Sequence, residues 1–502
     1  MGLHPPLVRY NTLNVQEISV INIIKCMGQE NMEISYYGSG KTIYNKEEYK
    51  FDLYMNKASG DVVIYINYPK MHSSFLQFPM DIDFLSCELD TGFRFTLVNC
   101  IRLKTEHRVS EGRCVFSYYA QFLIEGINND DKPKFDEMYF AIDNIIRWGE
   151  LSGYIMGDNH KIIKNPTREI IILKTDEYTI KYCVTSDLLP VCDIELMQEH
   201  ISLNQQGYIS IAFIEKKDIH EFVTLFTKIK RLIELCVLNT IDVTQISAFN
   251  SSIYDEYGDL KVPREIEIIS SMKGNKNTEK DDVHIIKWLR LPELISNNSF
   301  SLYIENYEKM EPIVELFIET IYNRTMSPVR RFFNIVQALE TYHSRFVICS
   351  IKPQKLKKRI ENTVLTHVPT EAKDRYRKLL WANTVNFITL ESRLADLMVA
   401  NFEIFFDTGE INRMDFPKVI ALTRNYYTHY DEQIKKNGKV LENNELPIYT
   451  DILLHILEFY ILKELGFTDV NQIREKINHR WGNASEILSI KRMSDKMKNN
   501  VT

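Results

Sequence analysis

The chain has 502 residues and a formal net charge of −7, and 44% of its residues are hydrophobic. This length predicts two to four domains, and the composition excludes a disordered or fibrous protein. The negative charge argues against a protein that coats nucleic acid along its whole length. No basic segment with a long apolar run opens the chain, and the eight cysteines form no C-x-x-C pair. We expect a cytoplasmic protein with reduced thiols and no membrane span.

Residues 1–150 are predicted to be rich in β-strand. Apolar and polar residues alternate in several segments, with many β-branched and aromatic side chains, as expected of half-buried strands. Strands at this spacing are typical of an antiparallel sandwich or barrel-like unit, ended by a last strand and a short helix between residues 135 and 154. The predicted strands are 32–37, 61–68, 93–100 and 114–124, and the predicted turns are 38–40, 58–60, 91–92 and 128–131.

Residues 151–300 are predicted to be a mixed α/β continuation of the N-terminal module. The segments 169–173, 178–184 and 207–214 have the composition of strands. Between residues 218 and 238, apolar residues recur every three or four positions, which predicts a helix with one face in the core.

From about residue 291 the apolar period becomes helical. Ser327-Pro328 predicts a helix start, and Gly466 predicts a helix end. The predicted helices are 307–324, 329–349, 390–406, one beginning at 415–417, and 448–465. The fold class is therefore α+β, with a sandwich-like β-rich region, a mixed middle region, an all-α bundle over residues 301–480 and a basic tail over 481–502.

Basic residues outnumber acidic residues between Ser327 and Lys378, and most strongly between residues 352 and 359. A basic face on a helical bundle suits a polyanion such as RNA. An exposed, hydrated helix face gives the same composition, so both interpretations stay open. The candidate RNA-binding residues are Lys355, Lys357, Lys358 and Arg359.

Three Arg-x4-His pairs occur, so this spacing alone selects no site. Context favours Arg424 and His429, because they lie on a predicted bundle helix and a neutral polar residue, Asn425, follows the Arg. Residues four apart share a helix face, which places Asn425 beside His429. Tyr426, Tyr427 and Tyr430 supply aromatic rings that either pack in the core or stack on bases. The other two pairs are Arg102/His107 and Arg474/His479.

These residue types suffice for RNA cleavage without a metal or another cofactor. RNA supplies its own nucleophile, the 2′-OH, and an imidazole moves protons near neutral pH. A guanidinium binds the phosphate, and the Asn425 amide orients either the phosphate or the imidazole. Because one His does not easily act as both acid and base, two copies across a dimer seam are expected. The alternative is an Arg and a His that only cap or pair within a bundle.

The predicted helix that precedes this stretch has the sequence Arg331-Phe-Phe-Asn-Ile-Val-Gln-Ala-Leu-Glu-Thr-Tyr-His343. Together with the Arg-Asn-x3-His stretch, it resembles the HEPN superfamily, in particular the ApeA-like HEPN branch of antiphage defence proteins. Residues 95–100 and 139–148 are similar to the ApeA N-terminal domain. The resemblance covers most of residues 30–470.

The resemblance implies an endoribonuclease of an antiphage, or abortive infection, system that cleaves tRNA or another RNA at a dimeric site. The implied partners are RNA, further copies of the chain and a phage-derived trigger, and the expected products carry 2′,3′-cyclic phosphate and 5′-OH ends. Two alternatives stay open: a non-catalytic HEPN-type adaptor that binds nucleotides or RNA, and a β-sandwich ligand-binding protein whose helical half dimerises. The implied catalytic residues are Arg424, Asn425 and His429, supported by Glu340, His343 and Tyr430.

Overall fold

The computed structural model describes residues 35–481, apart from 57–58, 70–77, 128–131, 144, 188–202, 258–259, 273–287, 324, 348–360, 377–387 and 399–414. The chain divides into two compact units. The first contains Met1–Pro133 and Ile266–Glu279, and the second contains Lys134–Glu265 and Lys280–Thr502. The predicted domain boundaries at residues 150, 300 and 480 stay predictions.

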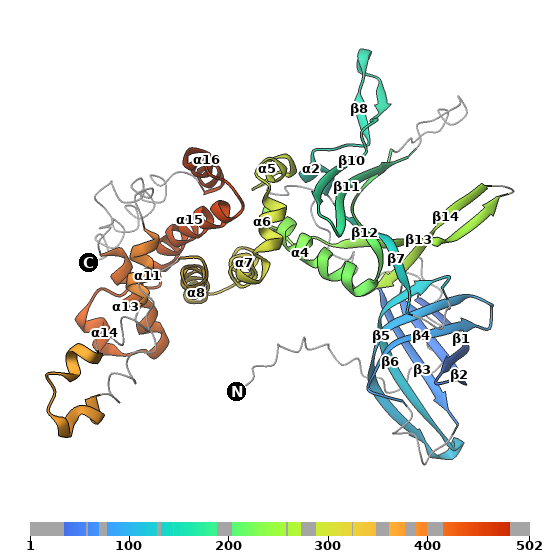
Figure 1. The fold of residues 1–502 in the computed structure, drawn as a ribbon, viewed down its shortest axis with the longest axis horizontal. Coiled ribbons are helices and arrows are strands. Elements are labelled where there is room, and N and C mark those ends of the chain that lie inside the picture. The colour runs from blue at the N-terminus through green and yellow to red at the C-terminus, as the bar shows by residue number, and fades with distance from the viewer. Residues whose placement is uncertain are drawn as a thin grey trace. The chain divides into compact units, whose positions relative to one another are not determined.

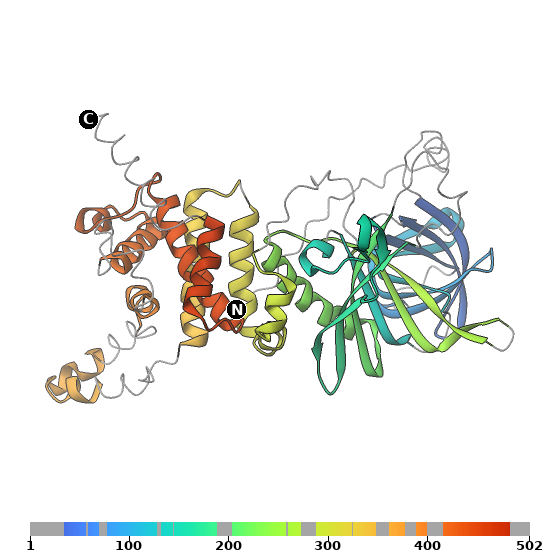
Figure 2. The same ribbon diagram turned by 90° about the horizontal axis from the view of Figure 1, so that it is seen from above.

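Six antiparallel strands close the first unit into a barrel, so the barrel-like alternative describes this β-rich region. Its strands pair in the order β1-β2-β3-β6-β5-β4, and β4 returns to β1 (Figures 1 and 2). Burial alternates strictly along β3, as the sequence pattern predicts. The strands are β1 (Ser35–Tyr44), β2 (Glu47–Asn56), β3 (Asp61–Tyr68), β4 (Asp81–Leu89), β5 (Arg94–Arg108) and β6 (Arg113–Glu125), with a 3-10 turn η3 (Val109–Glu111) before β6.

The predicted turn at residues 38–40 is wrong, because these residues lie inside β1 and pair with β2. A second strand, β4, approaches the same segment. A Cβ atom added to Gly40 would lie 2.2 Å from the carbonyl oxygen of Glu88 and 2.7 Å from the Cα atom of Leu89. Gly40 therefore marks a close approach of two strands. The predicted turn at 91–92 is confirmed, and the one at 128–131 lies outside the described residues.

The second unit begins with a five-stranded antiparallel sheet, in the order β10-β11-β12-β7-β13, against which the long helix α4 packs. The ring of Phe226 on α4 stacks on Phe140 of β7, with the centroids 3.9 Å apart. This sheet confirms the strands and the helix predicted between residues 169 and 238. Its elements are β7 (Lys134–Ile142), α2 (Ile145–Gly149), β10 (Glu169–Lys174), β11 (Tyr178–Ser186), β12 (Gln205–Asp218), α4 (Ile219–Val237) and β13 (Val243–Tyr257).

A hairpin and one further strand complete the described β-part. A two-stranded hairpin, β8 (Tyr154–Met156) and β9 (Ile162–Lys164), encloses the 3-10 turn η4 (Asp158–His160). The first residues of the strand β14 (Leu260–Ser270) belong to the second unit. Its last residues belong to the first unit, where they pair with β6.

The other described elements of the second unit are helices, and α8 is central among them. It packs against α7, α15 and α11 and also touches α13; α7, α8 and α15 run side by side in Figure 2 (yellow and red). Ser327 caps α8 and Gly466 follows α15 with φ +89°, both as predicted. The helices are α5 (Leu291–Ser296), α6 (Ser299–Glu305), α7 (Tyr307–Tyr322), α8 (Pro328–Phe346), η5 (Thr370–Ala372), α11 (Leu390–Leu397), α13 (Phe416–His429), α14 (Glu432–Asn437), α15 (Leu446–Glu464) and α16 (Val470–Trp481).

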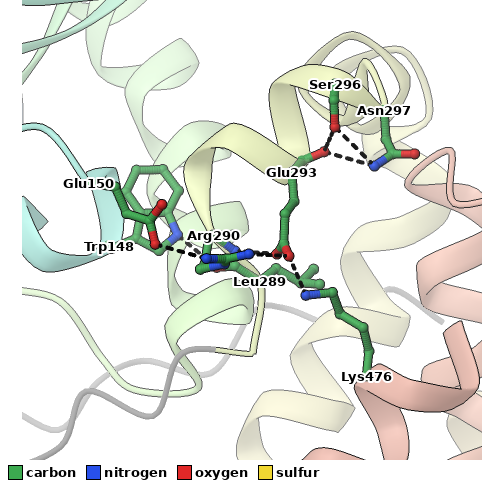
Figure 3. Close-up of polar contacts among 8 residues, drawn as sticks. All are labelled: Trp148, Glu150, Leu289, Arg290, Glu293, Ser296, Asn297 and Lys476. Atoms are coloured by element: carbon green, nitrogen blue, oxygen red, sulfur yellow. Dashed lines mark hydrogen bonds and ion pairs between the residues drawn. The ribbon is translucent and has the colours of Figure 1, made fainter. Parts of the chain in front are cut away.

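A cluster of charged residues, here named the α5 junction, ties α2, α5 and α16 together within the second unit (Figure 3). Arg290 donates to Glu150 after α2 at 3.2 Å and to Glu293 in α5 at 3.1 Å. Lys476 of α16 donates to the same Glu293 oxygen at 2.5 Å. Arg290 and Glu293 together therefore link Glu150, after α2, to α16, the last described helix. No helix within the described ranges is long and apolar enough to cross a membrane.

Candidate active site

The predicted catalytic residues lie on α13, and its inner face is firmly held. Pro417 stands in the first turn, where its missing N–H leaves no helical hydrogen bond unmade. Phe416, Ile420 and Thr423 are buried, and the Thr423 hydroxyl accepts a 3.0 Å hydrogen bond from the backbone N–H of Leu441. The half-buried and exposed side chains of Arg424, Asn425 and His429 follow along the same helix.

Arg424 is oriented by Glu340 of α8. Its Nη2 lies 3.0 Å from Glu340 Oε2 and 3.4 Å from Oε1, and its Nη1 donates to Asn425 Oδ1 at 3.1 Å. The Arg424 and Glu340 side chains are 32% and 29% exposed, so water and a ligand can still reach them. Within the described residues these contacts leave Nε–H and a second N–H of Nη1 uncommitted. The guanidinium therefore keeps donors for a phosphate while it is held in place.

His429 is the last residue of α13, and its side chain is exposed. Among the described residues no hydrogen-bond partner is seen for its imidazole. The sequence places Asn425 and His429 on one helix face, but Asn425 bonds to Arg424 instead. Within the described part of the chain, no partner is seen for the Asn425 side-chain N–H groups, which can therefore donate beside the guanidinium.

His343 lies on the same helix as Glu340 but faces a different neighbour. It is buried, with 1% of its surface exposed, and its Nε2 lies 2.9 Å from Asp396 Oδ2 of α11. Arg393 Nη1 lies 3.3 Å from His343 Nδ1. Because a guanidinium only donates, Nδ1 accepts and Nε2–H donates to the carboxylate. His343 thus joins α8 to α11, while Glu340 joins α8 to α13.

Tyr430 ends α13 in the left-handed conformation, with φ 52° and ψ 35°. The residue is 66% exposed, and its ring centroid lies 5.9 Å from that of Tyr426 and 6.1 Å from that of Tyr427. Tyr426 and Tyr427 are themselves edge to face at 5.1 Å. Burial raises the pKa of Tyr427, whose hydroxyl donates to the carbonyl oxygen of Leu441 at 3.2 Å. These three rings, named here the tyrosine cluster, flank His429.

The other two Arg-x4-His pairs lie in different surroundings. Arg102 of β5 donates to the carbonyl oxygen of Phe78, and His107 Nδ1 lies 3.1 Å from Cys114 Sγ inside the barrel unit. Arg474 lies on α16, and nothing is described of the His479 side chain. The candidate RNA-binding residues Lys355, Lys357, Lys358 and Arg359 lie outside the described residues.

Sequence reasoning did not find Arg393 and Asp396, which contact His343. Their spacing of three residues on a helix was a signal for a polar pair. The sequence does not show which helix lies opposite Arg393 and Asp396. The packing of α11 on α8 shows that it is α8, which carries His343.

Two family models match the chain. Apea-like HEPN matches residues 333–471, which include Glu340, His343, Arg424, Asn425 and His429. ApeA N-terminal domain 1 matches residues 38–307, from β1 to the first residue of α7. No curated protein and no solved structure matches the chain.

The helices α8 and α13, with their charged contact, thus belong to a HEPN-domain protein. Because the second match covers more than half of the 502 residues, the chain belongs to the family of ApeA-like HEPN antiphage defence proteins.

Proposed function

We propose that the chain is a metal-independent endoribonuclease that carries out the defence role of its family in the cytoplasm, with tRNA as one candidate substrate. The observation that carries this proposal is the Arg424–Glu340 contact between the two helices of the HEPN match. It holds a guanidinium with free donors on the helix that ends in an exposed imidazole. Positioned guanidinium and imidazole groups are what cleavage of an RNA phosphodiester requires.

In the proposed reaction, the 2′-oxygen of a ribose forms a bond to the adjacent phosphorus, and the bond from phosphorus to the 5′-oxygen breaks. His429 either takes the proton of the 2′-OH or gives a proton to the leaving 5′-oxygen, and solvent water carries out the other of these two proton transfers. Arg424 donates to the non-bridging oxygens as charge grows on them. The products carry a 2′,3′-cyclic phosphate and a 5′-OH. The RNA supplies the nucleophile, so a metal-bound hydroxide has no role in this reaction.

Helix geometry supports a site shared between two copies of the chain. Arg424 and His429 are five residues apart, which corresponds to about 7.5 Å along an α-helix and about 140° around it. Two side chains that leave one helix in such different directions do not easily contact the same phosphate group. An Arg from one copy and a His from the other meet this need, and a two-fold dimer would form two such sites.

The test compares RNA cleavage by the purified full chain with that by Arg424→Ala and His429→Ala. Loss of a proton-transfer group or of a phosphate donor should lower the rate by roughly 10²–10⁴-fold. Arg102→Ala and Arg474→Ala are matched controls, and they should cut like the parent, as should the parent in the presence of a chelator. If both site variants cleave RNA at the parental rate, the proposed function is wrong. If no form cleaves RNA but all bind it, the adaptor alternative holds.

A further inference from the structure

Tyr430 combines two properties that packing alone does not explain. The residue is 66% exposed, although a large aromatic side chain usually covers most of its surface. Its backbone has φ 52°, a left-handed conformation that Gly and Asn adopt readily and that other residues rarely adopt. An exposed ring held by a disfavoured backbone conformation directly after His429 is a feature of the kind found at functional sites.

The other two rings of the tyrosine cluster contact the Tyr430 ring edge to face, and their hydroxyls have hydrogen-bond partners. The Tyr427 hydroxyl donates to Leu441, and the Tyr426 hydroxyl lies 3.4 Å from Glu432 Oε1 on α14. Tyr426 precedes His429 by three residues, so it leaves the helix about 60° from the imidazole. The cluster is therefore a rigid aromatic surface next to the proposed proton-transfer group.

The charges around this surface are compatible with RNA. The Asp431 carboxylate is used to cap α14, where it accepts from the N–H of Gln433 at 2.9 Å. Lys435 lies over the Tyr426 ring, with its Nζ 5.8 Å from the centroid, and Lys436 follows in the last turn of α14. Glu432 lies within hydrogen-bond distance of Tyr426. Glu442 and Glu445, which follow α14 in the chain, act electrostatically on Tyr427, and Glu445 pairs with Lys439 at 3.9 Å. Lys435 thus lies beside the Tyr426 ring, with Lys436 next to it on α14, and such cations suit a phosphate next to a stacked base.

We propose that the tyrosine cluster is a stacking platform for an unpaired base next to the scissile phosphate, so that the chain selects single-stranded or looped RNA. This inference rests on the proposed ribonuclease function. Bases stack on exposed tyrosine rings when they are free to leave a helix, and bases in an A-form duplex are covered by their neighbours. The platform therefore predicts a preference for RNA structure, with little preference for a particular base.

The test measures binding in the His429→Ala background, in which the bound RNA is not consumed. The probe is a short RNA that contains 2-aminopurine, used as a single strand and after annealing to its complement. Tyr430→Asn removes the ring but tolerates a left-handed backbone, and it should weaken single-strand binding roughly 5- to 100-fold. Tyr430→Phe keeps the ring and should restore binding. Tyr37→Asn, at an exposed tyrosine of β1, is the matched control.

Three results would overturn the platform. The first is that Tyr430→Asn binds the single strand as tightly as the His429→Ala background does. The second is that Tyr430→Asn weakens binding of the duplex as much as it weakens binding of the single strand. The third is a loss of binding that follows a loss of self-association in analytical ultracentrifugation, because the cluster would then be a contact between copies.

Kinetics with His429 intact separate this inference from the function on which it rests. Tyr430→Asn should raise KM for single-stranded RNA and leave kcat within about threefold, because it removes binding made equally in ground and transition states. If the parent cleaves RNA and KM does not change, the platform fails and the ribonuclease stands. If the parent does not cleave RNA, the ribonuclease proposal fails first.

Discussion

Glu340 has a dual effect on Arg424, because it fixes the direction of the guanidinium and also neutralises part of its charge. The pair is about one-third exposed, and such ion pairs add only about 0–1 kcal/mol to stability. A carboxylate that contributes so little to folding is better explained by the position it gives to Arg424.

Glu340→Ala should therefore lower kcat/KM for RNA cleavage by roughly 10–100-fold, because a misplaced Arg loses its alignment with the phosphate. The thermal unfolding midpoint should move little. Glu319→Ala is the matched control, since Glu319 of α7 pairs with Arg330 of α8 at 3.4 Å in the same bundle. Parental kcat/KM in Glu340→Ala would mean that Arg424 finds its position without this carboxylate.

Among the helices, α8 positions the residues of the candidate site through its contacts with α13 and α11. Glu340 and His343 are three residues apart, yet one contacts α13 and the other contacts α11. The buried His343 imidazole, with partners on both nitrogens, fixes the register of α8 against α11.

His343→Ala should lower the free energy of unfolding by about 2–4 kcal/mol, since it opens a cavity and removes two hydrogen bonds. Chemical denaturation monitored by circular dichroism measures this change. Asp396→Ala should cost less, because the Asp396 side chain is 55% exposed. The folded His343→Ala protein should keep kcat within about threefold. A large loss of kcat without a loss of stability would assign His343 to the chemistry.

The sequence predicts a helix or strand well where one face of that element is buried in a single hydrophobic core. Burial follows the apolar pattern in β3, α4 and α8, and the ends of α8 and α15 follow local capping residues. The strand β2 also alternates, with Tyr49, Phe51, Leu53 and Met55 buried, so its signal was present and was missed. The turn assigned at residues 38–40 failed because only the approach of β4 explains Gly40.

The candidate site is likewise predictable from the sequence only in part. Local spacing and the neighbouring polar residue distinguish Arg424 and His429, because both signals lie on one helix. The contacts of Glu340 and His343 depend on how three helices pack, so the sequence gives the two residues without their partners. The hydrogen bond that Arg424 donates to Asn425 depends on a side-chain conformation that helical spacing does not specify.

At the scale of the second unit, the α5 junction should make folding depend on pH. Burial acts to raise the pKa of Glu293, but hydrogen bonds from Lys476 and Arg290 outweigh it, so the pKa lies below its usual value. A carboxyl group with a lowered folded-state pKa stabilises the fold above its unfolded pKa of about 4.3. That stability is lost as the pH falls through the folded-state pKa.

Glu293→Gln should therefore lower the thermal midpoint at pH 7 and flatten its decline between about pH 5 and pH 3. Glu48→Gln is the control, because Glu48 pairs with Lys41 in a largely exposed ion pair of the barrel. It should leave the pH profile close to that of the parent. If the thermal midpoint of Glu293→Gln changes with pH in parallel with that of the parent, the α5 junction does not cause the pH dependence of this unit's stability.

At the scale of the assembly, a shared site makes a prediction about mixed dimers. A dimer of one Arg424→Ala chain and one His429→Ala chain keeps one site with both residues intact. Random pairing of equal amounts makes half of the dimers mixed, so about a quarter of the parental activity should return. Each variant alone should stay inactive. No recovery, with mixed dimers present by native mass spectrometry, would contradict a site that takes its Arg and its His from different copies.

The central claim is that His429 and Arg424 cut RNA by attack of the 2′-OH. Its most direct test is to sequence RNA 5′-OH ends, with 2′,3′-cyclic phosphate ends mapped in parallel, after induced expression of the parent and of His429→Ala. We expect new paired ends of both kinds in cells that express the parent, and none in cells that express His429→Ala. New ends that carry 5′-phosphate, or the same set of ends with His429→Ala, would contradict it.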